Sequence, residues 1–202
     1  MLPSKFCVVL LAIIASGSIQ FSAHELFGEE KIQRLDLVDT TGNIRRLDEW
    51  KSSKLIVFIF VGTTCPISNG YAPEYRRLVE EFDSRGVSFL AIHPDADVNA
   101  ETASKHAKDY KITMPVLLDP EQRLAKTTGV SVTPEAVVLS PQGEILYRGR
   151  IDDKYLAAGP GRRRLEAKER TLAQAIAGLL EGKEPVEART KAHGCPLPVT
   201  NR

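Results

Sequence analysis

The sequence predicts one α/β domain with a mixed central sheet, helices on both faces and a hairpin extension at the N-terminal side. Buried-strand patterns alternate with helical patterns through the middle of the chain, which favours parallel strands joined by helices. A strand–turn–strand pattern then adds an antiparallel pair, and a helix closes the order. At 202 residues the chain is long enough to bury a stable hydrophobic core without stabilising disulfides or metal ions.

The N-terminal hairpin is predicted from two short segments around a glycine-containing turn. Residues 32–38 alternate apolar and polar side chains and meet a polar turn at 39–43. Residues 44–47 then return as the second strand. A short helical turn at 48–53 leads into the central strand.

The central strand is the apolar, β-branched and aromatic run at residues 55–61, which is typical of a strand buried on both faces. It breaks at 62–64 and places Cys65 at the start of a helix, where Pro66 fits the first turn. The pair at 69–70, Asn-Gly, predicts an irregular first turn. The helix beyond it is amphipathic and is expected to end near Gly86.

The rest of the chain continues the alternation. The helix at 165–180 is preceded by an exposed loop at 159–164 and ends at Gly182, and the tail at 184–202 has little periodicity. The remaining predicted strands lie at 87–92, 114–119, 129–139 (interrupted at its start by Pro134) and 144–149, and the remaining helices at 101–110 and 120–127.

Cys65 is the first candidate for chemistry. The unpaired N–H groups and partial positive charge of a helix N-terminus favour the thiolate over the thiol. Thiol pKa values at such positions fall from about 8.5 to roughly 3.5–7.5. The alternative is a structural buried cysteine, which lies more often inside a strand or helix than at the junction between them. The junction therefore favours a reactive thiol.

The composition and the N-terminal segment limit the classes of protein to which this chain can belong. A net charge of +1 gives no electrostatic case for nucleic acid. Residues 1–23 resemble a secretory signal peptide, with Lys5 before an apolar core of about ten residues, too short for a comfortable membrane span. Cleavage after Ser18 fits the small-residue rule better than cleavage after Ala23, and an uncleaved membrane anchor is the alternative. We expect a periplasmic or secreted protein.

Processing would remove Cys7 and leave Cys65 and Cys195 in the mature chain. Disulfides persist outside the cytoplasm, so the two could be bridged. Their separation along the sequence does not decide whether they lie close together.

Three motifs in order resemble the thioredoxin-like superfamily. They are the buried strand ending in Thr-Cys-Pro, the later Val-Thr-Pro at 132–134, and the hairpin at 136–149. The chain resembles most the extracytoplasmic redoxins related to the alkyl-hydroperoxide-reductase and thiol-specific-antioxidant (AhpC/TSA) group, over roughly residues 30–182. The resemblance implies that Thr133 and Pro134 form a cis bond facing Cys65, which would leave a backbone edge open for a substrate strand.

Two departures narrow the chemistry. Thioredoxins carry a second cysteine where this chain has Ser68, so a local dithiol cycle is excluded. Peroxiredoxins carry Thr or Ser three residues before the peroxidatic cysteine, where this chain has Gly62. The hydroxyl groups lie instead at Thr63 and Thr64.

The predicted site therefore has Cys65 and Cys195 as catalytic residues. The substrate-binding residues are Thr64, Ser68, Thr133 and Pro134, with Thr64 also predicted to hydrogen-bond the thiolate. Cys195, in the tail at 183–202, would attack a sulfenic acid or mixed disulfide at Cys65. A permanent structural bridge or a free thiol at Cys195 remains the alternative. A cation near the thiolate is predicted from Arg148 or Arg150.

The sequence thus predicts an exported thiol oxidoreductase or peroxidase-like redoxin without a cofactor or metal. Its partners would be a thiol, disulfide or peroxide substrate and an external thiol reductant, with no nucleic acid and no stable membrane span. One alternative is a copper-binding protein that uses Cys65, Cys195 and His193, since thiolates suit Cu(I). In the copper chaperones of this superfamily, however, a histidine stands where this chain has Thr133 and Pro134. Another alternative is a non-catalytic binding domain.

Overall fold

The computed structural model describes residues 31–155, 164 and 166–197. The predicted signal peptide at 1–23 and most of the predicted loop at 159–164 lie outside the described residues. Within the described ranges, no helix combines the length and apolar character needed to cross a bilayer.

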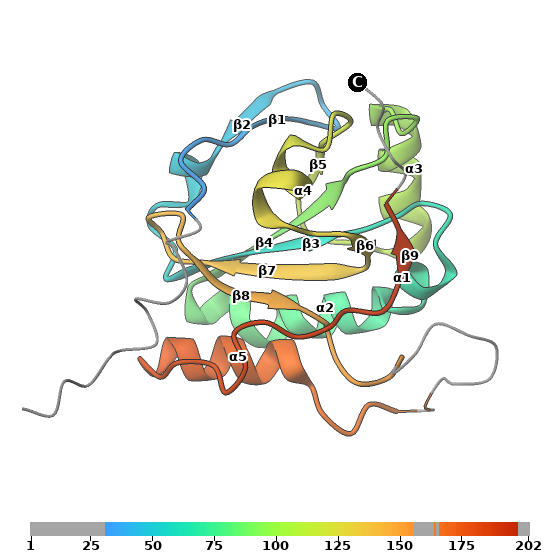
Figure 1. Cartoon of the computed structure of the whole chain (residues 1–202). Helices are drawn as coiled ribbons and strands as arrows, with labels where there is room; N and C mark the ends of the chain where they lie inside the picture. The colour runs from blue at the N-terminus through green and yellow to red at the C-terminus, as the bar shows by residue number, and fades with distance from the viewer. Residues whose placement is uncertain (1–30, 156–163, 165, 198–202) are drawn as a thin grey trace, which may run out of the picture.

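A seven-stranded mixed sheet forms the centre of the molecule, in the order β2-β1-β5-β4-β3-β7-β8 (Figure 1). The three inner strands β3, β4 and β5 run parallel, and the remaining pairs are antiparallel. The strands are β1 (Asp36–Asp39), β2 (Ile44–Arg46), β3 (Leu55–Phe60), β4 (Val87–His93), β5 (Val116–Leu118), β7 (Glu135–Leu139) and β8 (Ile145–Gly149). The predicted N-terminal hairpin is present, and it joins the sheet through the pairing of β1 with β5.

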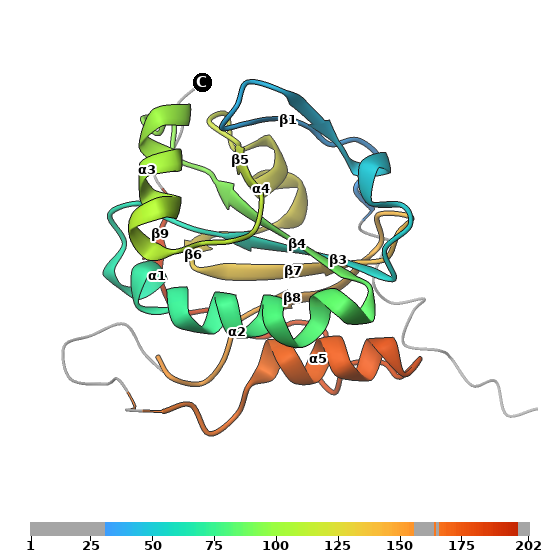
Figure 2. The ribbon, with the colours of Figure 1, turned by 180° about the vertical axis from the view of Figure 1, so that it is seen from behind.

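Helices cover both faces of this sheet (Figure 2). The α-helices are α1 (Pro66–Gly70), α2 (Ala72–Phe82), α3 (Ala100–Tyr110), α4 (Arg123–Thr128) and α5 (Thr171–Leu180), with short 3-10 turns at Leu47–Trp50 and Asp83–Arg85. Alternate side chains of β3 enter two separate cores. Val57 and Ile59 pack with residues of α2, α3 and α5, whereas Ile56 and Phe58 pack with α4 and the N-terminal segment. Burial on both faces explains why β3 is apolar at every position.

The irregular first turn predicted at residues 69–70 is confirmed. Helix α1 ends at Gly70, and Tyr71 separates it from α2. The segment then ends at Gly86, whose φ of 91° lies in the left-handed region that a glycine adopts without strain. The predicted mixed sheet with helices on both faces is therefore the observed thioredoxin-like arrangement.

The last helix is shorter than predicted, because α5 begins at Thr171 instead of Leu165. The backbone N–H groups of Lys168 and Glu169 donate to the Asp153 carboxylate at 2.7 and 3.0 Å. Because these two N–H groups donate to the buried Asp153 carboxylate, their residues do not take part in the helix, which starts only after them. Helical periodicity in the sequence does not reveal this competing acceptor.

The tail has little periodicity in the sequence, but part of it forms a strand. Residues Cys195–Pro196 form β9, which pairs antiparallel with β6 (Val132–Thr133) in a separate two-stranded sheet. In both ribbon views, β9 lies beside α1 at one end of the central sheet (Figures 1 and 2). The sequence shows no strand pattern here because the pairing is very short.

The hairpin turn generates a prediction about stability and pH. Asp39 accepts hydrogen bonds from the Thr41 hydroxyl at 2.6 Å and from the Thr41 and Asn43 N–H groups. The Thr41 hydroxyl is the largest influence on this carboxyl group, and the bonds together lower its pKa from 3.8 to about 2 despite partial burial. A lowered pKa stabilises the fold above the unfolded value, about 3.9, and this stabilisation is lost as the pH falls toward 2.

We expect Asp39→Asn to lower the free energy of unfolding at neutral pH by about 1–2 kcal/mol. The difference from the native chain should shrink between pH 4 and pH 2, as measured by urea denaturation at several pH values. Asp48→Asn, in the neighbouring 3-10 turn, is the matched control. A difference that stays constant with pH would contradict this account.

Candidate active site

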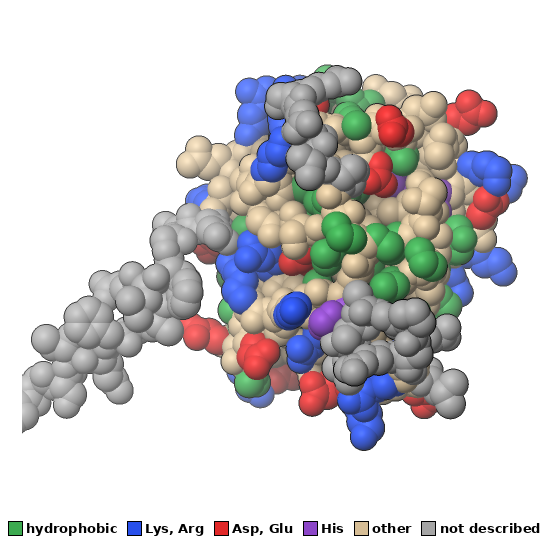
Figure 3. Space-filling view, turned by 45° about the vertical axis from the view of Figure 1, so that its right-hand side comes forward, with side chains coloured by type: hydrophobic (Ala, Val, Ile, Leu, Met, Phe, Trp, Pro, Cys, Tyr) green, Lys and Arg blue, Asp and Glu red, His purple; other side chains and the backbone are tan. Residues whose placement is uncertain are grey.

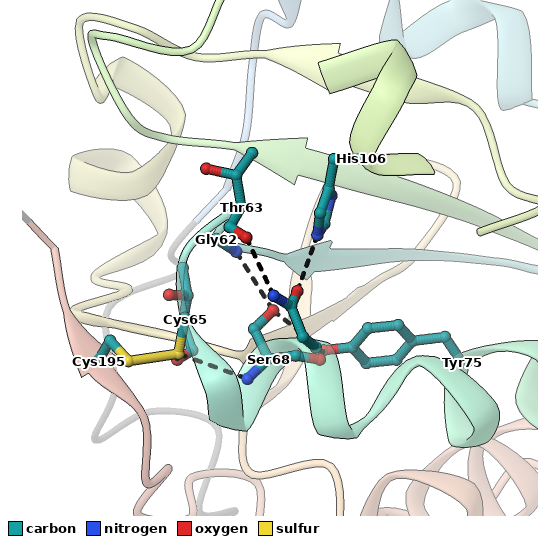
Figure 4. Close-up of a disulfide and its surroundings, with 9 residues drawn as sticks. Gly62, Thr63, Cys65, Ser68, Tyr75, His106 and Cys195 are labelled. Carbon is teal, nitrogen blue, oxygen red and sulfur yellow. Dashed lines mark hydrogen bonds between the residues drawn. A yellow bond between two sulfur atoms is a disulfide. The ribbon is translucent and has the colours of Figure 1, made fainter. Parts of the chain in front are cut away.

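Cys65 lies just beyond β3, at the junction with α1. It is the N-cap residue of α1, with extended backbone dihedral angles, and its side chain is only 3 % exposed. The Ser68 N–H lies 3.4 Å from the Cys65 sulfur and donates to it (Figure 4). An N–H aimed at the sulfur stabilises negative charge there, so the junction supplies the donor expected from the sequence.

Cys65 and Cys195 are joined by a disulfide, with their Cα atoms 5.9 Å apart (Figure 4). The sequence left open whether these residues lie close together. The structure places them together because β9 brings Cys195 opposite Thr133 in the register with β6. The site is thus assembled from two segments that lie 130 positions apart in the sequence.

Thr133 and Pro134 face Cys65, as the resemblance implied. Their peptide bond is cis, and the Thr133 carbonyl oxygen lies 3.1 Å from the Cys65 sulfur. Gly62 is required by this close packing, since an added Cβ would lie 2.8 Å from the Thr133 hydroxyl oxygen. The backbone edge that was expected to be open for a substrate is covered by β9, so that expectation is wrong for the disulfide form.

Ser68 and Thr64 differ in their surroundings. Ser68 is 1 % exposed, and its hydroxyl accepts a hydrogen bond from the Gly62 N–H at 3.2 Å and lies 3.4 Å from the Tyr75 hydroxyl. The Ser68 side chain therefore connects α1 to the end of β3 within the fold. Thr64 is exposed. The structure places the Ser68 backbone, not the Thr64 hydroxyl predicted from the sequence, as the donor at the sulfur.

A second link to this loop was not predicted. The side chain of Asn69 donates to the Thr63 carbonyl at 3.0 Å, and its oxygen accepts from His106 of α3 at 2.8 Å (Figure 4). His93 lies beside His106, with ring centroids 5.1 Å apart. His93 is 1 % exposed; burial, with a smaller contribution from His106, lowers its pKa to about 3. In the sequence, the available signal for this link was His106, a polar residue on the buried face of the predicted helix at 101–110.

The predicted cation is engaged elsewhere. Arg148 donates to the Thr128 carbonyl at 2.7 Å and lies 3.9 Å from the Glu135 carboxylate. Arg150 donates to Thr171 and lies 3.6 Å from the Glu169 carboxylate. Each guanidinium group thus has hydrogen-bond and ion-pair partners other than the sulfur. A cation beside the Cys65 thiolate stays a prediction.

The tail is also hydrogen-bonded to β8 and Arg150 at residues 188–190, before the chain reaches Cys195. The Arg148 N–H donates to the Ala188 carbonyl at 2.9 Å, and the Thr190 N–H donates to the Arg148 carbonyl at 3.0 Å. The Thr190 hydroxyl accepts from the Arg150 N–H at 3.0 Å and lies 2.7 Å from the Tyr147 hydroxyl. A Cβ at Gly149 would collide with Thr190, so a glycine is needed for this close approach. Thr190 is therefore a fixed point from which the last residues reach the site.

Among the residues that the structure describes, no group of three or more His, Cys, Asp or Glu side chains is arranged to hold a metal ion. The third residue of the alternative copper site, His193, has its pKa lowered, chiefly by burial and then by Lys191 and Arg150.

Comparison with known proteins agrees with this geometry. The sequence profile of the AhpC/TSA family matches residues 29–148. The thiol-disulfide oxidoreductase ResA of Bacillus cereus is 25% identical over 146 residues, which cover 68% of this chain and 83% of ResA. An uncharacterized conserved protein from Geobacillus kaustophilus superposes with a TM-score of 0.74 at 26% identity, covering 86% of this chain and 93% of that one. A hypothetical protein from Sinorhizobium meliloti shares the fold, with a TM-score of 0.75, 23% identity and coverage of 86% and 95%.

The buried hydroxyl of Ser68 generates a testable prediction. Ser68→Ala removes the acceptor of the Gly62 N–H and should lower the free energy of unfolding of the reduced protein by about 1–3 kcal/mol. Thr64→Ala, which removes an exposed hydroxyl from the same loop, should change it by less than about 0.5 kcal/mol. Urea denaturation of both variants measures the difference, and equal effects would show that the Ser68 bond does not support the loop.

Proposed function

The chain belongs to the AhpC/TSA family, and from this premise we propose that it is an exported thiol-disulfide oxidoreductase with Cys65 as its nucleophile and Cys195 as its resolving thiol. The observation that carries the proposal is the seating of Cys195 against Cys65, beside Thr133 and the cis-proline Pro134. The relatives named thiol-disulfide oxidoreductase ResA support the same reaction class.

The proposed cycle uses one disulfide exchange after another. In the reduced chain, the Cys65 thiolate attacks one sulfur of a substrate disulfide, and the other sulfur leaves as a thiolate. The Cys195 thiolate then attacks the Cys65 sulfur of this mixed disulfide and releases the rest of the substrate. The substrate gains two electrons, and the chain is left with the Cys65–Cys195 disulfide. An external thiol reductant restores the two thiols.

The surrounding residues have separate proposed roles. The Ser68 N–H stabilises charge on the Cys65 sulfur when that sulfur is the nucleophile or the leaving group. Thr133 and Pro134 present the backbone that meets the substrate, and exposed Thr64 lies at the rim of the site. The side chain of Ser68 acts by positioning the loop, because it is buried.

Peroxide reduction is a second reaction that we propose for the same pair of cysteines. A peroxide would oxidise the Cys65 thiolate to a sulfenic acid, and Cys195 would condense with it to the same disulfide and release water. Two observations favour disulfide exchange over this reaction. Gly62 replaces the hydroxyl-bearing residue expected in peroxiredoxins, and the guanidinium groups of Arg148 and Arg150 donate to the Thr128 carbonyl and the Thr171 hydroxyl.

The proposed organisation follows the sequence. Residues 1–23 form a signal peptide, with cleavage after Ser18, residues 30–182 form the redoxin domain, and residues 183–202 form the tail that carries Cys195. Export matches a mature chain that keeps two cysteines in a disulfide, because reducing compartments disfavour such bonds.

The cysteine variants test the cycle. Cys65→Ser should abolish turnover with a model disulfide in the presence of a thiol reductant, since the variant loses the sulfur to which the Ser68 N–H donates. Cys195→Ser should react once and accumulate a mixed disulfide at Cys65, visible as an added mass. Ser52→Ala, an exposed change outside the site, is the control and should turn over like the native chain. Repeating the assay with hydrogen peroxide compares the two reactions.

Unchanged turnover in Cys65→Ser would end the proposal. Tight, stoichiometric retention of Cu(I) by the reduced chain, lost in Cys195→Ala and unaccompanied by exchange, would support the copper-binding alternative instead.

A further inference from the structure

We propose that the edge of β6 beside Cys65 binds an extended, cysteine-containing peptide with glycine before the cysteine and an apolar residue two positions after it. The tail sequence Gly-Cys-Pro-Leu at 194–197 occupies this edge in the disulfide form and shows what the site accepts. This inference rests on the proposed function, because it names the substrate class of the same nucleophile.

The first step is backbone pairing. Thr133 pairs with Cys195 and Val132 with Pro196, and the Leu197 N–H donates to the Ser131 carbonyl at 3.0 Å. These contacts involve the main chain of both partners, so any extended peptide can make them. The pairing places a cysteine opposite Thr133, where its sulfur reaches Cys65.

The second step is the position before the cysteine. A Cβ added at Gly194 would collide with the Thr133 carbonyl and would lie 3.0 Å from the Pro134 nitrogen. Both obstacles are backbone atoms, one in β6 and one in the proline that follows it, so they cannot rotate away as a side chain could. The site therefore selects glycine at this position.

The third step is the side chains after the cysteine. Leu197 is half-buried and packs against the core that contains Ile56 and Phe58. Pro196, between Cys195 and Leu197, is exposed, so the structure places no demand on that position. Figure 3 shows apolar side chains grouped around the middle and right of one face of the molecule. The contact of Leu197 itself is with the buried cluster. An apolar residue two positions after the cysteine thus has a prepared contact.

The tail and an external peptide exclude each other, because both need the same edge of β6. Thr190 remains tied to β8 by contacts that do not involve the disulfide, and residues 191–194 tether Cys195 to it. A tether this short keeps the tail at an effective concentration on the order of millimolar. The site therefore opens to a peptide only after the disulfide is reduced, and the tail returns to displace the product.

The test uses the full-length reduced chain with Cys195→Ser and the capped peptide Ala-His-Gly-Cys-Pro-Leu, copied from residues 192–197. The peptide cysteine is activated as a mixed disulfide with thionitrobenzoate. The Cys65 thiolate attacks the peptide sulfur, the old disulfide bond breaks, and thionitrobenzoate leaves as a coloured thiolate. Mass spectrometry confirms that the peptide, not thionitrobenzoate, is bound to Cys65.

Two altered peptides give the comparison. Valine in place of the glycine should lower the second-order rate constant by about ten-fold or more, because the added side chain meets fixed backbone. Aspartate in place of the leucine should lower it by roughly three- to ten-fold through loss of the apolar contact. The tail competes equally with all three peptides, so the ratios report the peptide sequence alone. The symmetrical thionitrobenzoate disulfide, which has no peptide, measures the reactivity of Cys65 itself.

Equal rate constants for the three peptides, with normal reaction of the small disulfide, would overturn the specificity while leaving the proposed function intact. Reaction of the small disulfide but of none of the peptides would overturn the peptide site. Failure of the small disulfide itself would overturn the proposed function.

A variant of the native chain gives an independent measurement. Gly194→Val should weaken the seating of the tail, so its Cys65–Cys195 disulfide should be reduced at a glutathione ratio about ten-fold more oxidising than that needed for the native chain. Ala192→Val, in the same tether, is the matched control. If Gly194→Val and the native chain are reduced at the same glutathione ratio, the site does not select glycine.

Discussion

The end of β3 imposes the constraint on which the site depends. Beyond Phe60 the chain leaves the ladder of the sheet while it is still buried, and buried N–H and carbonyl groups need partners. The Gly62 N–H donates to the Ser68 hydroxyl, and the Thr63 carbonyl accepts from the Asn69 side chain. The Asn69 side chain in turn accepts a hydrogen bond from His106. These bonds fix the loop from α1 and α3, so Cys65 is presented on a supported turn. A site on supported backbone can hold its reacting sulfur in one position.

The tail satisfies a second requirement, because the β6 edge beside Cys65 would otherwise present unpaired backbone. An open edge recruits extended chains. In this protein the recruited chain belongs to the same molecule, and it carries the sulfur that completes the pair with Cys65. One structural element thus covers the edge, supplies the second thiol and limits access to the first. Its attachment through Thr190 explains how all three effects persist in a segment with almost no secondary structure of its own.

Most of the fold could be predicted because its signals are local. The uniform apolar run at 55–61 required a strand buried on both faces, and the Asn-Gly pair at 69–70 indicated the break between α1 and α2. The errors occurred where a distant group decides the outcome. Helix α5 starts late because Asp153 takes the N–H groups of Lys168 and Glu169, and β9 forms because β6 offers it an edge. The partners of Arg148 and Arg150 are likewise distant in sequence, at Thr128, Glu135 and residues 169–171, and no local pattern reveals them.

The sequence by itself determined that Cys65 stands at a strand-to-helix junction and that Ser68 gives it no local thiol partner. Both follow from residue types at adjacent positions. Only the tertiary structure decided that Cys195 is that partner, since chain separation does not fix spatial separation in a loosely patterned tail. It also decided which group donates to the sulfur, because the short Thr64–Ser68 segment can turn either a hydroxyl or a backbone N–H toward Cys65. Packing against Gly62 and Tyr75 selects the backbone N–H of Ser68.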